Sequence, residues 1–405
     1  MMKSKIFGGL ALATLLITSP LATDAATDRN IGIDTEKNPS ISDSYNKQAP
    51  YVEGEVLVKF KEDMSMNMQQ DVLSDINAEI LVDENVVDSP FNVLKVKDVD
   101  QVVQTLSNNS QIEYVEPNYI MNATYTPNDP FFDISYQYGL FTTETTSAWD
   151  VTTGNSNQVV AVLDTGVDYN HEDLDDKTIL GYNFVNNNNN PMDGNGHGTH
   201  VAGTAAAETN NGLGIAGVAP DTSILAVQVL DSSGSGSLAN IVDGIIYAAD
   251  YGAEVINLSL GCNCDTQAME DAVDYAWDSG SVVVAAAGNS STSTTFEPAS
   301  YDNAIAVGAV DENNNIASFS NYGSWVDVTA PGVEIAGTYP SNRYVYLSGT
   351  SMASPHVAGL AALLASQGKD NSEVRRSIEN TATPISGTGY YFQHGLINSF
   401  DAVNY

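Results

Sequence analysis

Three short motifs, each placing one polar residue beside glycine, constrain this 405-residue chain more than any other feature. They are Asp164-Thr-Gly, His197-Gly-Thr-His and Gly-Thr-Ser351-Met-Ala-Ser-Pro-His. Asp164 follows the apolar run Val159–Leu163, which predicts a buried parallel strand that delivers the carboxylate to the edge of a sheet. His197 and Ser351 each precede a run of small apolar residues that predicts a helix.

The three polar side chains are the types that nucleophilic catalysis needs. A serine hydroxyl is a weak nucleophile until an imidazole accepts its proton, and the imidazole needs a carboxylate to fix its tautomer. The predicted helix places Ser351 near the positive end of a helix dipole. Asn289, after Ala-Ala-Ala-Gly288, offers an amide that can stabilise an oxyanion.

Each motif taken alone has an ordinary structural explanation. A serine before a helix is commonly an N-cap, and Asp-Thr-Gly or Gly-Asn is common turn chemistry. The combination in one chain, in the order Asp, His, Ser, is what favours catalysis, and this order is the one known for subtilisin.

On these residues the chain resembles the subtilases, and within them the thermitase branch. The resemblance runs from about Tyr125 to Tyr405 and rests on long strings: Tyr125-Thr-Pro-Asn-Asp-Pro, Ser281-Val-Val-Val-Ala-Ala-Ala-Gly-Asn289 and Leu347-Ser-Gly-Thr-Ser-Met. It implies a serine endopeptidase with Ser351 as nucleophile, His197 as general base and Asp164 as the orienting carboxylate. Asn289 and the Ser351 backbone N–H would be the oxyanion donors. His200 and His356 are not catalytic in the family pattern.

Residues 1–25 are typical of a secretory signal peptide. Lys3 and Lys5 precede the apolar stretch 6–17, and small residues suited to cleavage follow at 23–25. A transmembrane anchor is the alternative, but the stretch is short for a membrane span, and no other segment is long enough. We therefore expect a secreted, extracellular product.

Residues 26–124 are expected to form a linker and a small domain. Residues 26–49 are polar without an apolar period. Strands are predicted at Glu55–Phe60, Asn92–Val96 and Ile112–Val115, and helices at Met66–Ile80 and Val99–Leu106. This order predicts a ferredoxin-like α+β domain. The resemblance implies an inhibitory propeptide, cut near Thr124/Tyr125, whose tail lies in the cleft. A small structural domain that is never removed is the alternative.

Residues 125–405 alternate predicted strands with predicted helices. The strands are Val159–Leu163, Ser223–Val229, Glu254–Leu258, Ser281–Ala286 and Ala304–Val307, and the helices are Ile241–Tyr251 and Met269–Ser279. This alternation predicts an α/β domain with a mainly parallel sheet covered by helices on both faces, the three-layer fold of subtilisins, with its chemistry at the carboxyl ends of the strands.

The charge is strongly acidic. The chain carries 51 Asp and Glu against 14 Lys and Arg, a net charge of −37. From Tyr125 onward, 32 acids face 5 bases, which gives −27, and the first 124 residues hold the other 19 acids and 9 bases. Nucleic acid and anionic membranes are therefore excluded as partners. The surface is typical either of a salt-tolerant enzyme or of an acidic secreted one.

The two cysteines, Cys262 and Cys264, are separated by one residue. An exported chain permits a disulfide, but a ring this small gains little loop entropy. A bridge and two free thiols both remain open. A zinc site is excluded, because no third and fourth ligand lie nearby.

The resemblance implies a structural calcium ion. Its ligands would be the carboxylates of Asp129 and Asp173, the side chain of Asn211 and backbone oxygens of Glu208, Leu213 and Ile215. Solvated surface acids are the alternative. A second family site falls on the loop 183–190, where amides replace the carboxylates and weaken it. A weak calcium or sodium site would involve Ala299, Tyr301 and Asp327.

The substrate is expected to bind as an added strand. By resemblance it lies between Ser259-Leu260-Gly261 and the stretch after 234–237, with Gly288 beside it. The walls of the first specificity pocket, 285–288, are small and uncharged, which predicts broad cleavage after apolar or aromatic residues.

The sequence thus predicts a secreted, calcium-stabilised serine endopeptidase that matures by cutting itself. Its partners would be protein and peptide substrates and its own propeptide, and we expect a monomer. A sedolisin-type acid peptidase is disfavoured, because that chemistry replaces His197 and Asn289 with carboxylates. A non-catalytic binding protein of the same fold is disfavoured by the intact set of catalytic residues.

Overall fold

The computed structural model describes residues 51–61, 64–81, 90–120 and 126–405. Contacts divide these residues into two compact units, one within 39–123 and one that includes 124–405. The predicted signal peptide, the linker and the cut near Thr124/Tyr125 lie outside the described residues. Among the residues described, no helix is long and apolar enough to span a bilayer.

The smaller unit is an antiparallel sheet carrying two helices. Its strands are ordered β2-β3-β1-β4, and its elements are β1 (Tyr51–Phe60), α1 (Met66–Asp75), β2 (Glu79–Leu81), β3 (Asn92–Lys95), α2 (Val99–Ser107) and β4 (Ile112–Tyr119). The three predicted strands and two predicted helices are present in the predicted order, and β2 is an additional strand that the sequence did not identify. The first helix is shorter than predicted, because Asn77 takes a left-handed φ of 52° and residues 79–81 pair with β3.

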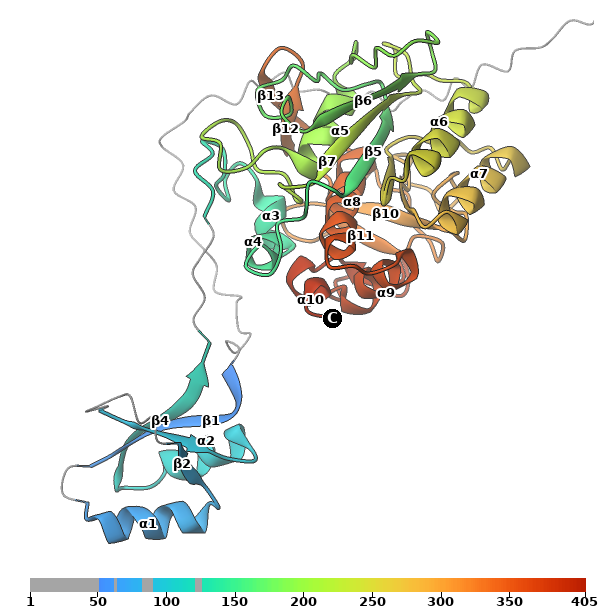
Figure 1. Ribbon diagram of the computed structural model, residues 1–405. Coiled ribbons are helices and arrows are strands. Elements are labelled where there is room, and N and C mark those ends of the chain that lie inside the picture. Colours follow the sequence, from blue (N-terminus) through green and yellow to red (C-terminus); the bar gives the residue numbers. More distant parts are fainter. Residues whose placement is uncertain (1–50, 62–63, 82–89, 121–125) are drawn as a thin grey trace, which may run out of the picture. The chain divides into compact units, whose positions relative to one another are not determined.

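The larger unit is built on an eight-stranded sheet whose paired strands are all parallel, in the order β14-β11-β10-β9-β8-β5-β7-β6 (Figure 1). Five strands confirm the prediction to within about three residues: β5 (Val159–Asp164), β7 (Ser223–Gln228), β8 (Val255–Leu258), β9 (Val282–Ala286) and β10 (Ala304–Val310). The sequence reading did not identify β6 (Thr178–Asn183), β11 (Val328–Pro331) or β14 (Gly395–Leu396). An antiparallel hairpin, β12 (Ile335–Tyr339) and β13 (Arg343–Leu347), lies outside the sheet.

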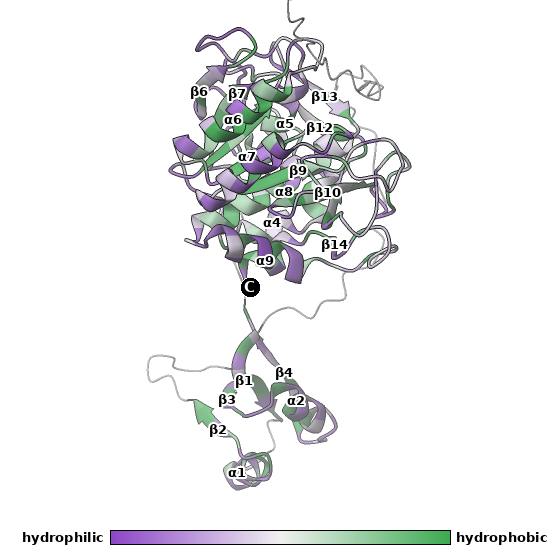
Figure 2. Ribbon diagram, turned by 90° about the vertical axis from the view of Figure 1, so that its right-hand side faces the viewer, coloured by the Kyte–Doolittle hydropathy of each residue, from purple (hydrophilic) through white to green (hydrophobic). Residues whose placement is uncertain are grey.

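Helices cover both faces of the sheet, as predicted. The longer ones are α5 (His197–Ala206), α6 (Leu238–Tyr251), α7 (Gln267–Asp278), α8 (Thr350–Ser366) and α9 (Asn371–Thr381), and the short ones are α3 (Tyr138–Thr142), α4 (Thr145–Ala148) and α10 (Ser399–Val403). Alternate β5 side chains enter two cores: Val160 and Val162 pack in the core that holds α5 and α8, and Leu163 packs in the core that holds α6 and α7. Figure 2 shows the apolar strand β9 and the mixed apolar and hydrophilic surface of α7, whereas α8 is buried along almost its whole length.

The sheet order explains where the chemistry gathers. Strands β5, β8 and β9 are neighbours, and parallel strands end at one edge. Asp164 therefore lies beside Ser259, which follows β8, and near Gly288, which follows β9. Helix α8 is buried from Thr350 to Ala365 and packs against these strands. It begins at the same edge, because Ser351 is hydrogen-bonded to Ser259.

Candidate active site

Asp164 and His197 form a direct hydrogen-bonded pair. Asp164 is the last residue of β5 and is fully buried, and its Oδ1 lies 2.7 Å from Nδ1 of His197, the first residue of α5. The Thr165 backbone N–H donates to the same oxygen at 2.7 Å. A proton on Nδ1 that is held by this carboxylate leaves Nε2 as the basic nitrogen of the ring.

Glycine at position 198 is required for this approach. A β-carbon there would overlap the carbonyl oxygen of Gly166 and would lie 2.9 Å from Cβ of Asp164. The first turn of α5 therefore packs directly on the end of β5, which brings the ring to the carboxylate.

Ser351 is the second residue of α8 and is 6% exposed. Its hydroxyl donates to the carbonyl of Ser259 at 3.3 Å, and the Ser259 hydroxyl donates to the Ser351 carbonyl at 2.8 Å. Ser354 is tied to Asn257 of β8 by a hydrogen bond of 2.7 Å. These bonds fix the first turn of α8 on the end of β8. The first N–H groups of a helix have no intrahelical partner. They form the positive end of the helix dipole, which here lies at the start of α8.

The amide of Asn289 is oriented by the residue before Ser351. Its Oδ1 accepts from the backbone N–H of Thr350 at 2.8 Å and from the Thr350 hydroxyl at 2.9 Å. The Thr350 hydroxyl in turn accepts from the Gly288 N–H at 3.0 Å. Because the carbonyl end of the amide is bound, Nδ2 is the end left to donate, beside the start of α8.

His200 and His356 have a different role. Burial lowers the pKa of His200 to about 3 and that of His356 to about 4, so both rings are neutral at ordinary pH. Ring nitrogens of the two bond to the carbonyls of Ile335 and Met352. The structure thus places both histidines in the core as packing residues.

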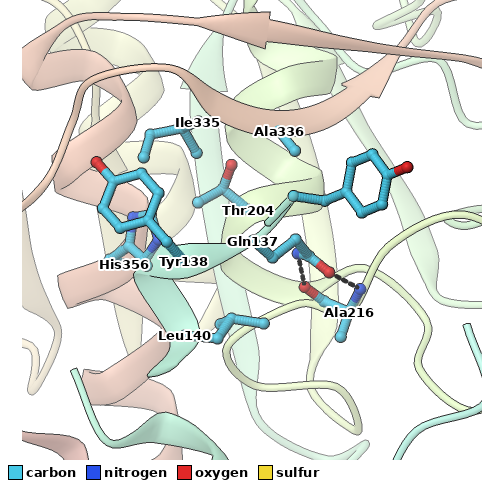
Figure 3. A pocket seen from close by; sticks show the side chains of 10 residues that line it. Gln137, Tyr138, Leu140, Thr204, Ala216, Ile335, Ala336 and His356 are labelled. Carbon is cyan, nitrogen blue, oxygen red and sulfur yellow. Dashed lines mark hydrogen bonds between the residues drawn. The ribbon is translucent and has the colours of Figure 1, made fainter. Parts of the chain in front are cut away.

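A small pocket with a volume of about 10 Å³ lies beside His356 (Figure 3). Its wall includes Gln137, whose side chain makes two hydrogen bonds to the backbone of Ala216, at 2.8 and 2.9 Å. A cavity of this size has room for about one water molecule, which excludes it as a substrate site.

The structure brings together most of the segments named as calcium ligands. Asp129 accepts from the N–H groups of Asn210 and Asn211, and Asp173 accepts from the Ile215 N–H at 2.9 Å and from the Asn211 amide at 2.9 Å. The Leu213 N–H donates to the Asn211 side chain.

Burial is the largest cause that raises the pKa of both carboxylates, that of Asp173 to about 6, and Asp129 raises it further. Asp129 and Asp173 are thus two buried carboxylates held by the same loop, and carboxylate oxygens are the hard donors that fit calcium.

The side chain of Glu208 contacts this set through a hydrogen bond with the Asn211 side chain. It forms a group with Asp175 and Asp176 whose carboxylate oxygens all lie within 4.8 Å of one another, and it accepts from the Asp176 N–H at 3.1 Å. Its backbone N–H donates to the Asp173 carbonyl at 2.9 Å. Both the main chain and the side chain of Glu208 therefore contact residues of the predicted calcium site.

At the predicted weak metal site, the positive charge beside the carboxylate is an arginine side chain of the protein. Asp327 is 6% exposed, and a guanidinium nitrogen of Arg375 lies 3.5 Å from its Oδ2. Arg375 also donates to the Asp302 carbonyl, which lies next to Tyr301. Burial raises the pKa of Asp327 to about 6, and Arg375 opposes that shift. A metal ion at Ala299, Tyr301 and Asp327 would have to compete with this side chain. In the loop 183–190, where the second family calcium site would fall, the Asn183 side chain is hydrogen-bonded to the backbone of Asn186 and Asn190.

The segment 259–261 continues directly from β8. Cys262 then pairs with Glu297 through two backbone hydrogen bonds, at 2.9 and 2.8 Å. The sulfur atoms of Cys262 and Cys264 lie within bonding distance of each other. Gly288 takes a φ of 97°, and a β-carbon there would lie 2.5 Å from the Asn321 amide nitrogen. The side chains at 285–287 are buried, so only their main chain and Gly288 can line an open pocket.

Sequence reasoning missed several residues that support the site. Thr350 orients Asn289, Asn257 and Ser354 anchor α8, and Asp193 binds the loops that carry Asp164 and His197. The one available signal was the position of Asp193, four residues before His197 in a glycine-rich segment.

Comparisons with known proteins agree with this geometry. Residues 155–397 match the model of the subtilase family (peptidase S8), and residues 37–118 match the fervidolysin N-terminal prodomain. The chain is 58% identical over 404 residues to a thermophilic serine proteinase of Bacillus sp. (strain AK1), with 100% of both chains covered. It is 56% identical over 281 residues to thermitase of Thermoactinomyces vulgaris, which covers 69% of this chain and 100% of thermitase.

A solved protease of Pseudoalteromonas arctica PAMC 21717 superposes with a TM-score of 0.64 at 33% identity, over 69% of this chain and 99% of that one. The family match spans the segments that carry Asp164, His197, Asn289 and Ser351. The chain therefore belongs to the subtilase family of serine proteases, in the thermitase branch, with an N-terminal prodomain.

Proposed function

We propose that Asp164, His197 and Ser351 form the catalytic triad of this serine endopeptidase. The observation that carries the proposal is the 2.7 Å hydrogen bond between the buried Asp164 and Nδ1 of His197, at the sheet edge where Ser351 lies in the first turn of α8. The bond assigns the tautomer that makes Nε2 the base.

The reaction follows from these positions. Nε2 of His197 takes the hydroxyl proton as Oγ of Ser351 attacks the peptide carbonyl, and the imidazolium that forms is stabilised by Asp164. Nδ2 of Asn289 and the Ser351 N–H donate to the developing oxyanion. The imidazolium then protonates the leaving amine, and water releases the acyl group by the reverse proton path. Serine–histidine contacts are often loose without substrate, which accords with the present bond of the Ser351 hydroxyl to Ser259.

We propose that calcium stabilises the mature enzyme through Asp129, Asp173, Asn211 and the main chain at 208, 213 and 215. Support comes from two buried carboxylates with raised pKa that both accept hydrogen bonds from the loop 210–215. Calcium supplies the opposite charge that these carboxylates need in order to stay ionised inside the protein. It would also tie the segment around Asp129 to the body of the unit.

We propose further that the chain is secreted and matures by its own cleavage. Residues 1–25 would be removed as a signal peptide, and residues 26–124 would act as an intramolecular inhibitor until Ser351 cuts near Thr124/Tyr125. The prodomain match at residues 37–118 supports this order of events. The mature enzyme, 125–405, is proposed to act as a monomer on exposed protein and peptide segments.

The substrate would bind as a strand along Ser259-Leu260-Gly261 and the stretch after 234–237, with its side chain beside Gly288. Small uncharged neighbours favour broad cleavage after apolar or aromatic residues. We propose that Cys262 and Cys264 are joined, since their sulfurs lie within bonding distance. The bridge would stiffen the turn after the strand-binding segment, which the Cys262–Glu297 pairing already anchors.

Ser351→Ala tests the assignment in the full chain. We expect the purified variant to keep residues 26–124 and to lack peptidase activity, because one nucleophile performs both reactions. Ser366→Ala, at the other end of α8, is the matched control and should mature normally. Normal self-maturation of purified Ser351→Ala would contradict the proposal.

A further inference from the structure

Asp193 is a buried carboxylate outside the proposed triad that accepts five hydrogen bonds. It is 6% exposed and lies in the segment between β6 and α5. Its Oδ1 accepts from the Thr165 hydroxyl at 2.9 Å, from the Asn195 N–H at 2.8 Å and from the Gly196 N–H at 2.9 Å. Its Oδ2 accepts from the Thr199 N–H at 3.0 Å and from the Thr199 hydroxyl at 2.6 Å.

These five donors belong to the two segments that carry the acid and the base. Thr165 directly follows Asp164, and its own N–H binds the Asp164 carboxylate. Asn195, Gly196 and Thr199 surround His197. The circuit is closed by the Gly198 N–H, which donates to the Thr165 hydroxyl at 3.0 Å. One carboxylate thus joins the end of β5 to the start of α5.

Asp193 also acts as the missing cap of α5. The N-cap residue of this helix is Gly196, which has no side chain to accept from the first N–H groups. Asp193 accepts from Thr199, the third helical residue, which is the bond that a capping side chain normally makes. The N-cap position and the side chain that caps the helix therefore belong to different residues, Gly196 and Asp193.

We propose that Asp193 is a positioning residue that holds His197 against Asp164 in the geometry of proton transfer. The proposal rests on the proposed triad. Proton transfer and attack need reacting groups within a few tenths of an ångström of their productive positions, and a displacement of about 1 Å can cost about 100-fold in rate. Gly198 packs on Asp164, and the hydrogen bonds of Asp193 and Thr165 fix the start of α5 relative to the end of β5.

Two variants break the circuit in different ways. Asp193→Asn keeps the shape of the side chain but replaces one carboxylate oxygen with an NH₂ group. Either the two donors of Thr199 or the three donors to Oδ1 then lose their acceptor. Thr165→Val keeps the side-chain volume at position 165 and the charge of Asp193. It removes the Thr165 hydroxyl and with it the hydrogen bonds to Asp193 and from the Gly198 N–H. Thr165→Ser restores that hydroxyl. Asp311→Asn is the control, since Asp311 accepts two backbone N–H groups in a loop outside the proposed site.

The measurements are kcat, KM, the pH profile of kcat/KM and the melting temperature of each matured variant. We expect Asp193→Asn and Thr165→Val to lower kcat about 10- to 100-fold with KM changed less than about twofold. The acidic limb of the pH profile should move to lower pH in Thr165→Val, because a loosened Asp164 contact stabilises the imidazolium less. Thr165→Ser and Asp311→Asn should keep both values near wild type.

A fall in melting temperature with kcat and the pH limb unchanged in Thr165→Val would overturn the proposal, since it would leave Asp193 a purely structural residue. If Asp193→Asn fails to mature, the comparison of kcat and the pH profile between Thr165→Val and Thr165→Ser tests the proposal by itself. Activity retained in Ser351→Ala would instead contradict the proposed function, so the two failures are distinguishable.

Discussion

Asp173 gives the proposed calcium site a measurable pH signature in the metal-free enzyme. Burial is the main cause that raises its pKa to about 6, against hydrogen bonds from Ile215 and Asn211 that lower it. An aspartate in the unfolded chain titrates near about 3.9. The protonated form is therefore favoured by folding, and the stability it contributes is fully present below pH of about 4. That stability is lost as the pH rises through about 6.

The size of the loss follows from the shift. A difference of roughly 2 pKa units at about 1.4 kcal/mol per unit lowers the free energy of unfolding by about 3 kcal/mol at pH 7.5. For a domain of this size that is a fall in melting temperature of roughly 6 °C. Calcium should reverse the loss, because it compensates the buried charge and binds only the native state.

Asp173→Asn isolates this group from all other titrating residues. Any change in hydrogen bonding is the same in the variant at every pH, whereas about 2 kcal/mol of the wild-type loss falls between pH 4.5 and 7.5. The difference in melting temperature between wild type and variant should therefore change by roughly 4 °C over that interval. The assay is calorimetry on mature enzyme depleted of metal and inactivated by a serine-directed phosphonate to prevent autolysis. Millimolar calcium should stabilise the wild type far more than the variant. A difference that stays constant with pH, or an equal calcium response, would refute the reasoning.

Three further predictions concern the oxyanion, the close packing and the charge. Asn289→Ala should lower kcat by roughly 10²–10³ with little change in KM, a magnitude known from the equivalent asparagine of subtilisin; an unchanged kcat would remove Asn289 from this role. Gly198→Ala should lower both maturation yield and kcat, since its methyl group meets Gly166 and Asp164, and normal kinetics would contradict the packing argument. Raising sodium chloride from 0.1 to 2 M at saturating calcium should raise the melting temperature. Residues 125–405 carry a net charge of −27, and salt shortens the distance over which these charges repel one another. A flat or falling curve would contradict the salt prediction.

The central strands were predictable because their sequences are continuous apolar runs. Val159–Leu163 and 282–286 are buried on both faces, so no alternating pattern was needed to recognise them. Strand β6 was missed because it is an edge strand on which Leu180 is 51% exposed and its pattern is mixed. Helix α9 was also missed, although its capping box of Asp370 and Glu373 was readable in the sequence.

The proposed catalytic residues could be chosen from sequence because their chemistry is specific and each sits in a glycine-rich motif. The supporting contacts could not, since they join residues far apart in the chain. Asp327 and Arg375 are an example: an acid that looked like a metal ligand meets a guanidinium from α9. The five donors to Asp193 likewise converge only once β5 and α5 are packed.

The most direct test of the proposed triad is the site of covalent labelling by an aryl phosphonate ester of a hydrophobic amino acid. Mature enzyme should lose activity in step with the incorporation of one label, and peptide mapping by mass spectrometry should place that label on Ser351. His197→Ala, matured by added wild-type enzyme, should label far more slowly, because the hydroxyl is then no longer activated. A label on another residue, or full inactivation with Ser351 unmodified, would contradict the account.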